Sequence, residues 1–153
     1  MNKAIFHALT GTAAMLLIAC FWSSTVVSEL FMSHAVVTEI KRLIVYFGLA
    51  PLVLLMALTG AVGRMAARDR QGRLVEQKKK RMLAVSLNGL LVIIPCALYL
   101  YGKAATGGFD TGFYLVQALE LAAGFTQMIL LGLNFREGLT LAGRLRKSAA
   151  KEA

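Results

Sequence analysis

Charged residues are scarce in this sequence, and their scarcity excludes an ordinary water-soluble domain. Only 16% of the 153 residues are Asp, Glu, Lys or Arg, whereas 58% are hydrophobic. Soluble domains carry roughly 25% charged residues, and a chain of this length could not bury so much apolar surface in one core. The sequence therefore predicts a single domain over residues 1–153 whose outer surface faces lipid, with no soluble catalytic part.

Residues and motifs on which catalysis often depends are also scarce. The two cysteines, Cys20 and Cys96, form no C-x-x-C pair, so thiol–disulfide chemistry has no support. Both lie in apolar runs, where a buried cysteine behaves as a small hydrophobic side chain. The sequence contains no nucleotide-binding loop, serine-nucleophile, zinc-protease or calcium-loop motif. Whether the protein is an enzyme stays open.

Four long hydrophobic runs make up most of the chain. They cover approximately residues 4–27, 43–62, 83–101 and 113–133. Each is close to the roughly 17–25 residues that one helical crossing of a bilayer requires. The first run is longer than the roughly 7–15-residue apolar core of a cleaved signal peptide, so an uncleaved helix is expected. The predicted fold is an all-α, integral membrane four-helix bundle.

Basic residues are distributed unequally between the segments that flank these runs. Of the 17 Lys and Arg residues, fourteen lie before the first run, between the second and third, or after the fourth. The opposite side holds only Lys41, Arg42 and Lys103. Because segments rich in Lys and Arg remain in the cytoplasm, both termini and the middle segment are predicted to be cytoplasmic. This pattern is typical of a multi-pass protein of a bacterial-type inner (plasma) membrane.

A run of four basic residues precedes the third hydrophobic run: Lys78, Lys79, Lys80 and Arg81. Such a cluster attracts anionic lipid headgroups by about 1 kcal/mol per basic residue. The simpler interpretation, that the cluster only determines topology, is preferred. Nucleic acid is not expected as a partner, because no aromatic side chains alternate with these charges to stack on bases.

The fourth run carries a stripe of polar residues. Gln117, Glu120, Gln127 and Asn134 recur at offsets of three and seven, which places them on one helical face. Such a stripe must face protein or water and not lipid. An ionised side chain at the depth of Glu120 costs about 2.5 kcal/mol or more, so Glu120 is expected to be paired or protonated. Proton transfer and a structural hydrogen bond between helices both stay open as its role.

Depths along the helices, at about 1.5 Å per residue, divide the polar residues into two predicted clusters. The outer cluster comprises Gln117 and Glu120, with Glu29, His34, Tyr99 and Asp110 above them. The inner cluster comprises His7, Thr10, Asn88, Gln127 and Asn134.

Three local features complete the predicted architecture. The outer segment 28–42 contains no Gly or Pro and is predicted to extend the first or second helix, lying partly in the membrane interface. Pro51 predicts a kink in the second helix. Trp22 suits either an interfacial belt or packing between helices.

The histidines His7 and His34 are candidate haem or metal ligands, with haem b as the cofactor considered. They lie 27 residues apart, at opposite ends of the first helix, so one haem could not use both from one chain. Each could ligate a separate centre together with another residue. A metal site is a weaker alternative, formed by Glu29, His34, Glu39, Asp110 and Glu120. For each histidine alone, an interfacial or packing role is preferred.

Three short pieces of the first two helices resemble the HemJ-type protoporphyrinogen oxidases, which are small membrane proteins of four to five helices with haem-related chemistry. The pieces are KAIFH at 3–7, LFMSH at 30–34, and RL at 42–43 followed by Pro51. The resemblance covers about a third of the chain and would make His7 a functional residue. The first loop is shorter than in that family, and Arg81-Met82-Leu83 stands where the family has His-x-Lys.

Two functions are therefore carried forward. The first is an accessory or small-solute/proton-handling membrane component whose buried polar element is the stripe of the fourth helix. The second is a haem- or porphyrin-handling redox protein that uses His7 or His34. Either would have the lipid bilayer as its surroundings, as a homo-oligomer or as a subunit of a membrane complex. The sequence does not determine the substrate or the transported species.

Overall fold

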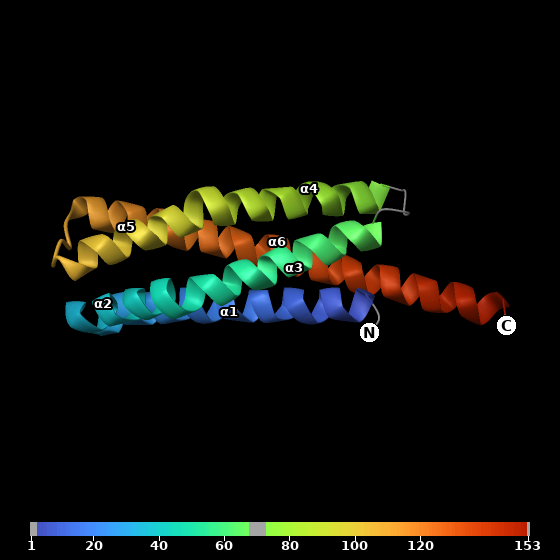
Figure 1. Ribbon diagram of the computed structural model, residues 1–153, viewed down its shortest axis with the longest axis horizontal. Coiled ribbons are helices and arrows are strands. Elements are labelled where there is room, and N and C mark those ends of the chain that lie inside the picture. Colours follow the sequence, from blue (N-terminus) through green and yellow to red (C-terminus); the bar gives the residue numbers. More distant parts are fainter. Residues whose placement is uncertain (1–2, 68–72, 153) are drawn as a thin grey trace.

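The computed structural model describes residues 3–67 and 73–152, which form a bundle of long helices (Figure 1). Two of the long helices each contain a short π-helical stretch, η1 or η2. The elements in chain order are α1 (Lys3–Phe31), α2 (His34–Leu43), η1 (Ile44–Gly48), α3 (Leu49–Ala67), α4 (Arg73–Asn88), η2 (Gly89–Ile93), α5 (Ile94–Ala105) and α6 (Thr111–Glu152).

Within the described residues, four helical stretches are long and apolar enough to cross a membrane. They are Ile5–Phe31, His34–Gly63, Lys79–Ala105 and Thr111–Thr140. Each overlaps one of the four predicted runs, although the second begins nine residues earlier than predicted. The prediction of an all-α chain with four candidate membrane-spanning helices is confirmed for the described residues. These stretches suggest a multi-pass membrane protein.

The segment 28–42 forms the end of α1, a tight turn at Met32 and Ser33, and the whole of α2 apart from Leu43. Ser33 has an extended backbone and accepts backbone hydrogen bonds from Val36 and Val37, which starts α2. The predicted helical extension is therefore present on both sides of the turn. One face of α2 is buried in the bundle, with Val37 and Lys41 each 1% exposed.

The helices pack unevenly around the bundle. α1 lies against α3 and α6, and α6 also packs on α4 and α5, whereas α3 and α4 touch each other far less. One cluster of buried side chains, Ala14, Ile18, Leu52, Val85 and Leu131, occupies the middle of the bundle. A second lies near the turns α1–α2 and α5–α6, here called the hairpin end, and contains Val37, Leu100, Ala104 and Phe113.

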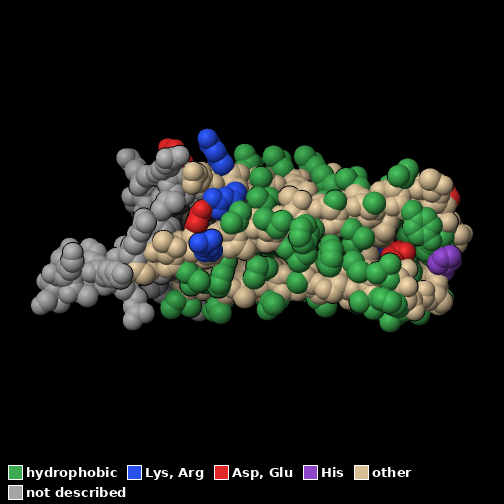
Figure 2. Space-filling view, turned by 180° about the vertical axis from the view of Figure 1, so that it is seen from behind, with side chains coloured by type: hydrophobic (Ala, Val, Ile, Leu, Met, Phe, Trp, Pro, Cys, Tyr) green, Lys and Arg blue, Asp and Glu red, His purple; other side chains and the backbone are tan. Residues whose placement is uncertain are grey.

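The outer surface is strongly hydrophobic along the middle of the bundle. The bundle consists of four rods, namely α1, α2–η1–α3, α4–η2–α5 and α6. Large apolar side chains are exposed on all four rods, for example Leu16, Leu54, Leu91 and Leu115, each at least 60% exposed. Charged side chains gather toward the ends in the face that Figure 2 shows. Both chain ends lie at the end opposite the hairpin end, here called the terminal end, and α6 projects beyond the bundle there (Figure 1). This distribution fits lipid as the surrounding medium.

Candidate functional site

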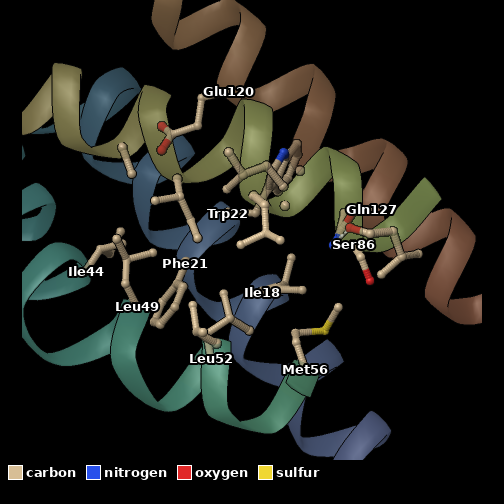
Figure 3. Close-up of a pocket in the computed structure, with 18 of the residues that line it drawn as sticks. Ile18, Phe21, Trp22, Ile44, Leu49, Leu52, Met56, Ser86, Glu120 and Gln127 are labelled. Carbon is tan, nitrogen blue, oxygen red and sulfur yellow. Dashed lines mark hydrogen bonds between the residues drawn. The ribbon is translucent and has the colours of Figure 1, made fainter. Parts of the chain in front are cut away.

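A cavity of about 240 Å³ lies among the four rods, and all of them contribute to its wall (Figure 3). Most of the lining is apolar, with Ile18 and Phe21 from α1 and Leu52 and Met56 from α3. Figure 3 shows Glu120 at one end of the cavity, and Ser86 and Gln127 at another. Apolar pockets with a few convergent polar groups are the usual form of small-molecule sites.

Both π-helical stretches border this cavity. Ile44 of η1 lines it, as do Gly89, Leu90 and Ile93 of η2. Each stretch precedes a proline, Pro51 or Pro95. A proline ring clashes with the carbonyl four residues earlier in an α-helix. A π-helical turn, which closes i→i+5 hydrogen bonds, changes the course of the helix backbone just before the proline. At Pro51 the predicted kink is thus accompanied by a π-helical stretch one turn earlier.

Glu120 is held by a buried cation from a helix far away in the chain. The Nζ atom of Lys41 donates a hydrogen bond to Oε2 of Glu120 at 2.6 Å, and the two side chains are 2% and 14% exposed. Gln117 donates to the same oxygen from Nε2 at 3.2 Å. Of the two expectations for Glu120, pairing or protonation, the structure shows pairing, with α2 in the outer segment that was predicted to extend a helix.

A second polar group on α6 joins it to α4. Asn88 donates from Nδ2 to Oε1 of Gln127 at 2.8 Å and to the carbonyl of Ala123 at 3.0 Å. Gln127 donates from Nε2 to the carbonyl of Val85 at 3.0 Å and is 2% exposed. Both ends of the Gln127 amide are thereby satisfied, as a buried amide requires.

The predicted inner cluster separates into three places. Besides the Asn88–Gln127 pair, His7 and Thr10 lie about one turn apart on α1, and His7 Nδ1 is 3.0 Å from the carbonyl of Thr59 in α3. The Thr10 hydroxyl donates within its own helix, to the carbonyls of Phe6 and His7. Asn134, which is 7% exposed, donates to the sulfur of Met82 at 3.3 Å. These residues share a half of the bundle but do not form one site.

Arg81 differs from its neighbours in the basic run. Its Nη2 atom donates to Oε1 of Glu137 at 2.5 Å, and both side chains are only about one-fifth exposed. Lys79 and Lys80 are exposed, and the side chain of Lys78 lies outside the described part. Arg81 is thus paired with a carboxylate of α6, and lipid-headgroup binding by the basic run stays a prediction.

Trp22 has a packing position. Its indole Nε1 donates to the carbonyl of Leu121 at 3.0 Å, and its ring lines the cavity. The close approach depends on Gly124, because a Cβ atom there would lie 3.1 Å from Cδ1 of Trp22. Of the two interpretations of Trp22, the structure supports packing between helices.

The predicted outer metal site does not form. Among residues 3–67 and 73–152, as far as their side chains are described, no three His, Cys, Asp or Glu residues gather as metal binding requires. Lys41 occupies the position of a cation beside Glu120. Two further carboxylates have basic partners of their own, in the pairs Glu39–Arg42 and Asp110–Lys103.

The histidines lie at opposite ends of the bundle, and neither lines the cavity. His34 stacks on Phe109 with ring centroids 4.0 Å apart, and its Nε2 is 3.5 Å from the hydroxyl of Tyr114. His7 lies beside Gly63, where an added Cβ would come within 3.0 Å of Cε1 of His7. These surroundings fit the interfacial or packing role that was preferred for each.

Fold and site together define a helical bundle with four candidate membrane-spanning helices around an apolar cavity. No protein-family model, curated protein or solved structure matches the chain. The resemblance to HemJ-type oxidases, and the haem chemistry that it implies, therefore stay predictions.

Lys41 is the functional candidate that reasoning from the sequence missed, because it was assigned to topology alone. The positions of Lys41 and Glu120 along their helices indicated that the two residues lie at similar depths. Lys41 lies seven residues into α2 and Glu120 nine residues into α6, both counted from the hairpin end. At about 1.5 Å per residue, the two side chains are at similar depths, so an unpaired carboxylate had a cation within reach.

Proposed function

We propose that this chain is a multi-pass inner-membrane protein that binds a small, largely hydrophobic molecule inside its helical bundle. The observation that carries the proposal is the apolar cavity of about 240 Å³, which all four rods line and which Glu120 borders. The positive-inside pattern of the sequence supports cytoplasmic termini, with the hairpin end on the opposite side.

The mouth of the cavity supports entry of the ligand from the bilayer. Val53 of α3 and Leu90 of η2 both line the cavity, yet they are 41% and 56% exposed. The opening therefore lies between these two elements, and α3 and α4, the helix that leads into η2, touch each other little. Both residues are near the middle of their apolar stretches, His34–Gly63 and Lys79–Ala105. In a membrane this depth faces acyl chains, so a lipid-soluble molecule would reach the cavity without passing through water.

The polar groups of the wall support a ligand with one hydrogen-bond donor. Lys41 and Gln117 both bind Oε2 of Glu120. Within the described part of the chain, no hydrogen bond to the other oxygen, Oε1, is found. A hydroxyl or N–H group at one end of an apolar ligand could donate to that oxygen, while its hydrocarbon part fills the space between Ile18 and Met56.

The lone tryptophan provides a direct test, because Trp22 is in the cavity wall. The full-length protein in detergent micelles is titrated with a brominated fatty alcohol, which quenches indole fluorescence at contact. Binding in the cavity predicts saturable quenching, which the unbrominated alcohol reverses by competition. Quenching that rises in proportion to the probe, without saturation or competition, would contradict the proposal.

A matched pair of glycine variants sharpens the test. Gly60 lines the cavity and Gly132 does not, and a Cβ atom would meet nothing within 4 Å at either position. Gly60→Leu is expected to fill part of the cavity and to weaken probe binding about tenfold or more, since each 1.4 kcal/mol of lost affinity is a factor of ten. Gly132→Leu is expected to bind the probe like the wild type. Equal affinity in both variants would exclude this cavity as the site.

A further inference from the structure

The ion pair of Lys41 and Glu120 has a third member, Glu29 of α1. Glu29 is close enough to Lys41 and Glu120 to interact electrostatically with both. It lies two residues before Phe31, the last residue of α1, so the group is near the hairpin end. Three helices, α1, α2 and α6, thus each contribute one ionisable side chain to a single cluster, here called the Glu29 cluster.

The charges of the Glu29 cluster do not balance. When ionised, two carboxylates accompany one ammonium, which leaves one negative charge beside the Lys41 side chain, only 2% exposed. Glu29 is partly buried, and its Oε1 atom is fully buried. Two other titratable groups lie nearby, His34 on α2 and the Cys96 thiol on α5. His34 is on the exposed rim and is already stacked on Phe109. An uncompensated buried charge is strongly unfavourable.

Hydrogen bonding shows a matching shortage of donors. Among the buried acceptor oxygens of the described residues that have no hydrogen-bond partner, two belong to this group, Oε1 of Glu29 and Oε1 of Gln117. Gln117 is only 4% exposed, and its Nε2 atom donates to Glu120, so its amide group is at the cluster. Buried acceptors almost always have a donor. One added proton would supply a donor and would cancel the remaining negative charge.

We propose that the Glu29 cluster is a proton-binding site, which holds one exchangeable proton on the carboxyl group of Glu29. Glu120 is the less suitable carrier, because the Lys41 ammonium and the Gln117 amide both donate to its carboxylate. The proton comes from water at the hairpin end and returns to it, so no electron transfer is involved. This site extends the proposed function and does not depend on it, because it requires no ligand in the cavity.

Infrared spectroscopy tests the proposal on the full-length protein. At neutral pH, a C=O stretching band of a protonated carboxyl is expected, and it should shift when H₂O is replaced by D₂O. Glu29→Gln should abolish this band. The matched control is Glu39→Gln, because Glu39 is exposed on the adjacent α2 and is paired with Arg42; that variant should keep the band. Absence of the band from the wild type, or its persistence in Glu29→Gln, would overturn the proposal.

A second variant tests the charge balance itself. In Lys41→Met the ammonium is lost, so both carboxyls should be protonated and the band area should rise about twofold. An unchanged area in a folded variant, as judged by circular dichroism, would contradict the proposed balance. Loss of the wild-type band on addition of NaCl, but not of choline chloride at equal ionic strength, would show that the cluster binds a metal cation in place of a proton.

Discussion

The ammonium of Lys41 and the carboxylate of Glu120 lie 2.6 Å apart although 79 positions separate them in the chain. This contact joins α2, near the start of the second rod, to α6, the last helix. It also borders the cavity, whose wall includes Glu120. One polar contact thus connects the packing of the hairpin end with the site proposed for ligand binding.

Removing one partner of this pair is expected to destabilise the protein strongly. In Lys41→Met the Glu120 carboxyl loses its cation and must take up a proton to stay inside the bundle, and removing one partner of a buried ion pair costs on the order of 3–5 kcal/mol. Thermal unfolding in detergent, followed by circular dichroism, measures the effect. Arg42→Met is the control, because the adjacent Arg42–Glu39 pair is about half exposed and such pairs contribute about 1 kcal/mol or less. Equal losses in the two variants would show that burial of the Lys41 pair is unimportant.

The amide pair between α4 and α6 is expected to contribute less. Asn88→Ala leaves Oε1 of Gln127 without the donor that it has at 2.8 Å, and an unsatisfied buried acceptor costs about 1–3 kcal/mol. Chemical denaturation in mixed micelles gives the free energy of unfolding. Thr126→Ala should change it by under about 0.5 kcal/mol, since Thr126 is exposed and donates to Ala122 of its own helix. A larger loss in Thr126→Ala than in Asn88→Ala would refute the prediction.

Gly124 is expected to be required for the position of Trp22. In Gly124→Ala the new methyl group would lie 3.1 Å from Cδ1 of the indole, so Trp22 must shift and its 3.0 Å hydrogen bond to Leu121 must weaken. The emission maximum of the only tryptophan should move, and stability should fall by about 1–3 kcal/mol. Gly132→Ala, where the methyl group meets nothing within 4 Å, should change neither property. An unchanged spectrum in Gly124→Ala would contradict the close contact.

Asp110, at the hairpin end, is expected to titrate below the usual range. The hydrogen bond from the Lys103 ammonium, and then the N–H of Phe113, hold the pKa of the Asp110 carboxyl below its ordinary value. A lowered pKa means that the stabilising effect of Asp110 is present above the unfolded-state pKa and is lost as the pH falls through the folded-state pKa. Carbon-13 NMR titration should show this low pKa in the wild type and a higher one in Lys103→Met. Identical titration curves would exclude the contact in solution.

Topology can be tested with reporter fusions at Gly72 and Gly107. Gly72 lies outside the described residues, in the basic middle segment, and Gly107 lies in the loop between α5 and α6. The positive-inside rule predicts a cytoplasmic reporter at Gly72 and an external one at Gly107. Reporters on the same side would show that the chain does not cross the membrane between them.

Local patterns were enough to predict the four rods, but they did not supply the contacts of the site. The stripe of the fourth helix was derived from helical periodicity, and the structure buries Gln117, Gln127 and Asn134 to 7% exposure or less. The prediction of an outer metal site was wrong, because helical periodicity says nothing about which helix lies opposite Glu120. The π-helical stretches were also missed: both precede prolines, of which only Pro51 was predicted to change its helix.

The sequence by itself determined that the chain is helical and that four segments suit lipid, because the length and apolarity of a segment are local properties. Only the tertiary structure decided that Lys41, and not a metal ion, accompanies Glu120, and that Trp22 approaches α6 at Gly124. The cavity is also a property of the tertiary structure. It depends on which helices are neighbours, at what depth their side chains meet, and how closely α3 and α4 approach each other. These relationships join residues far apart in the chain, so no single segment encodes them.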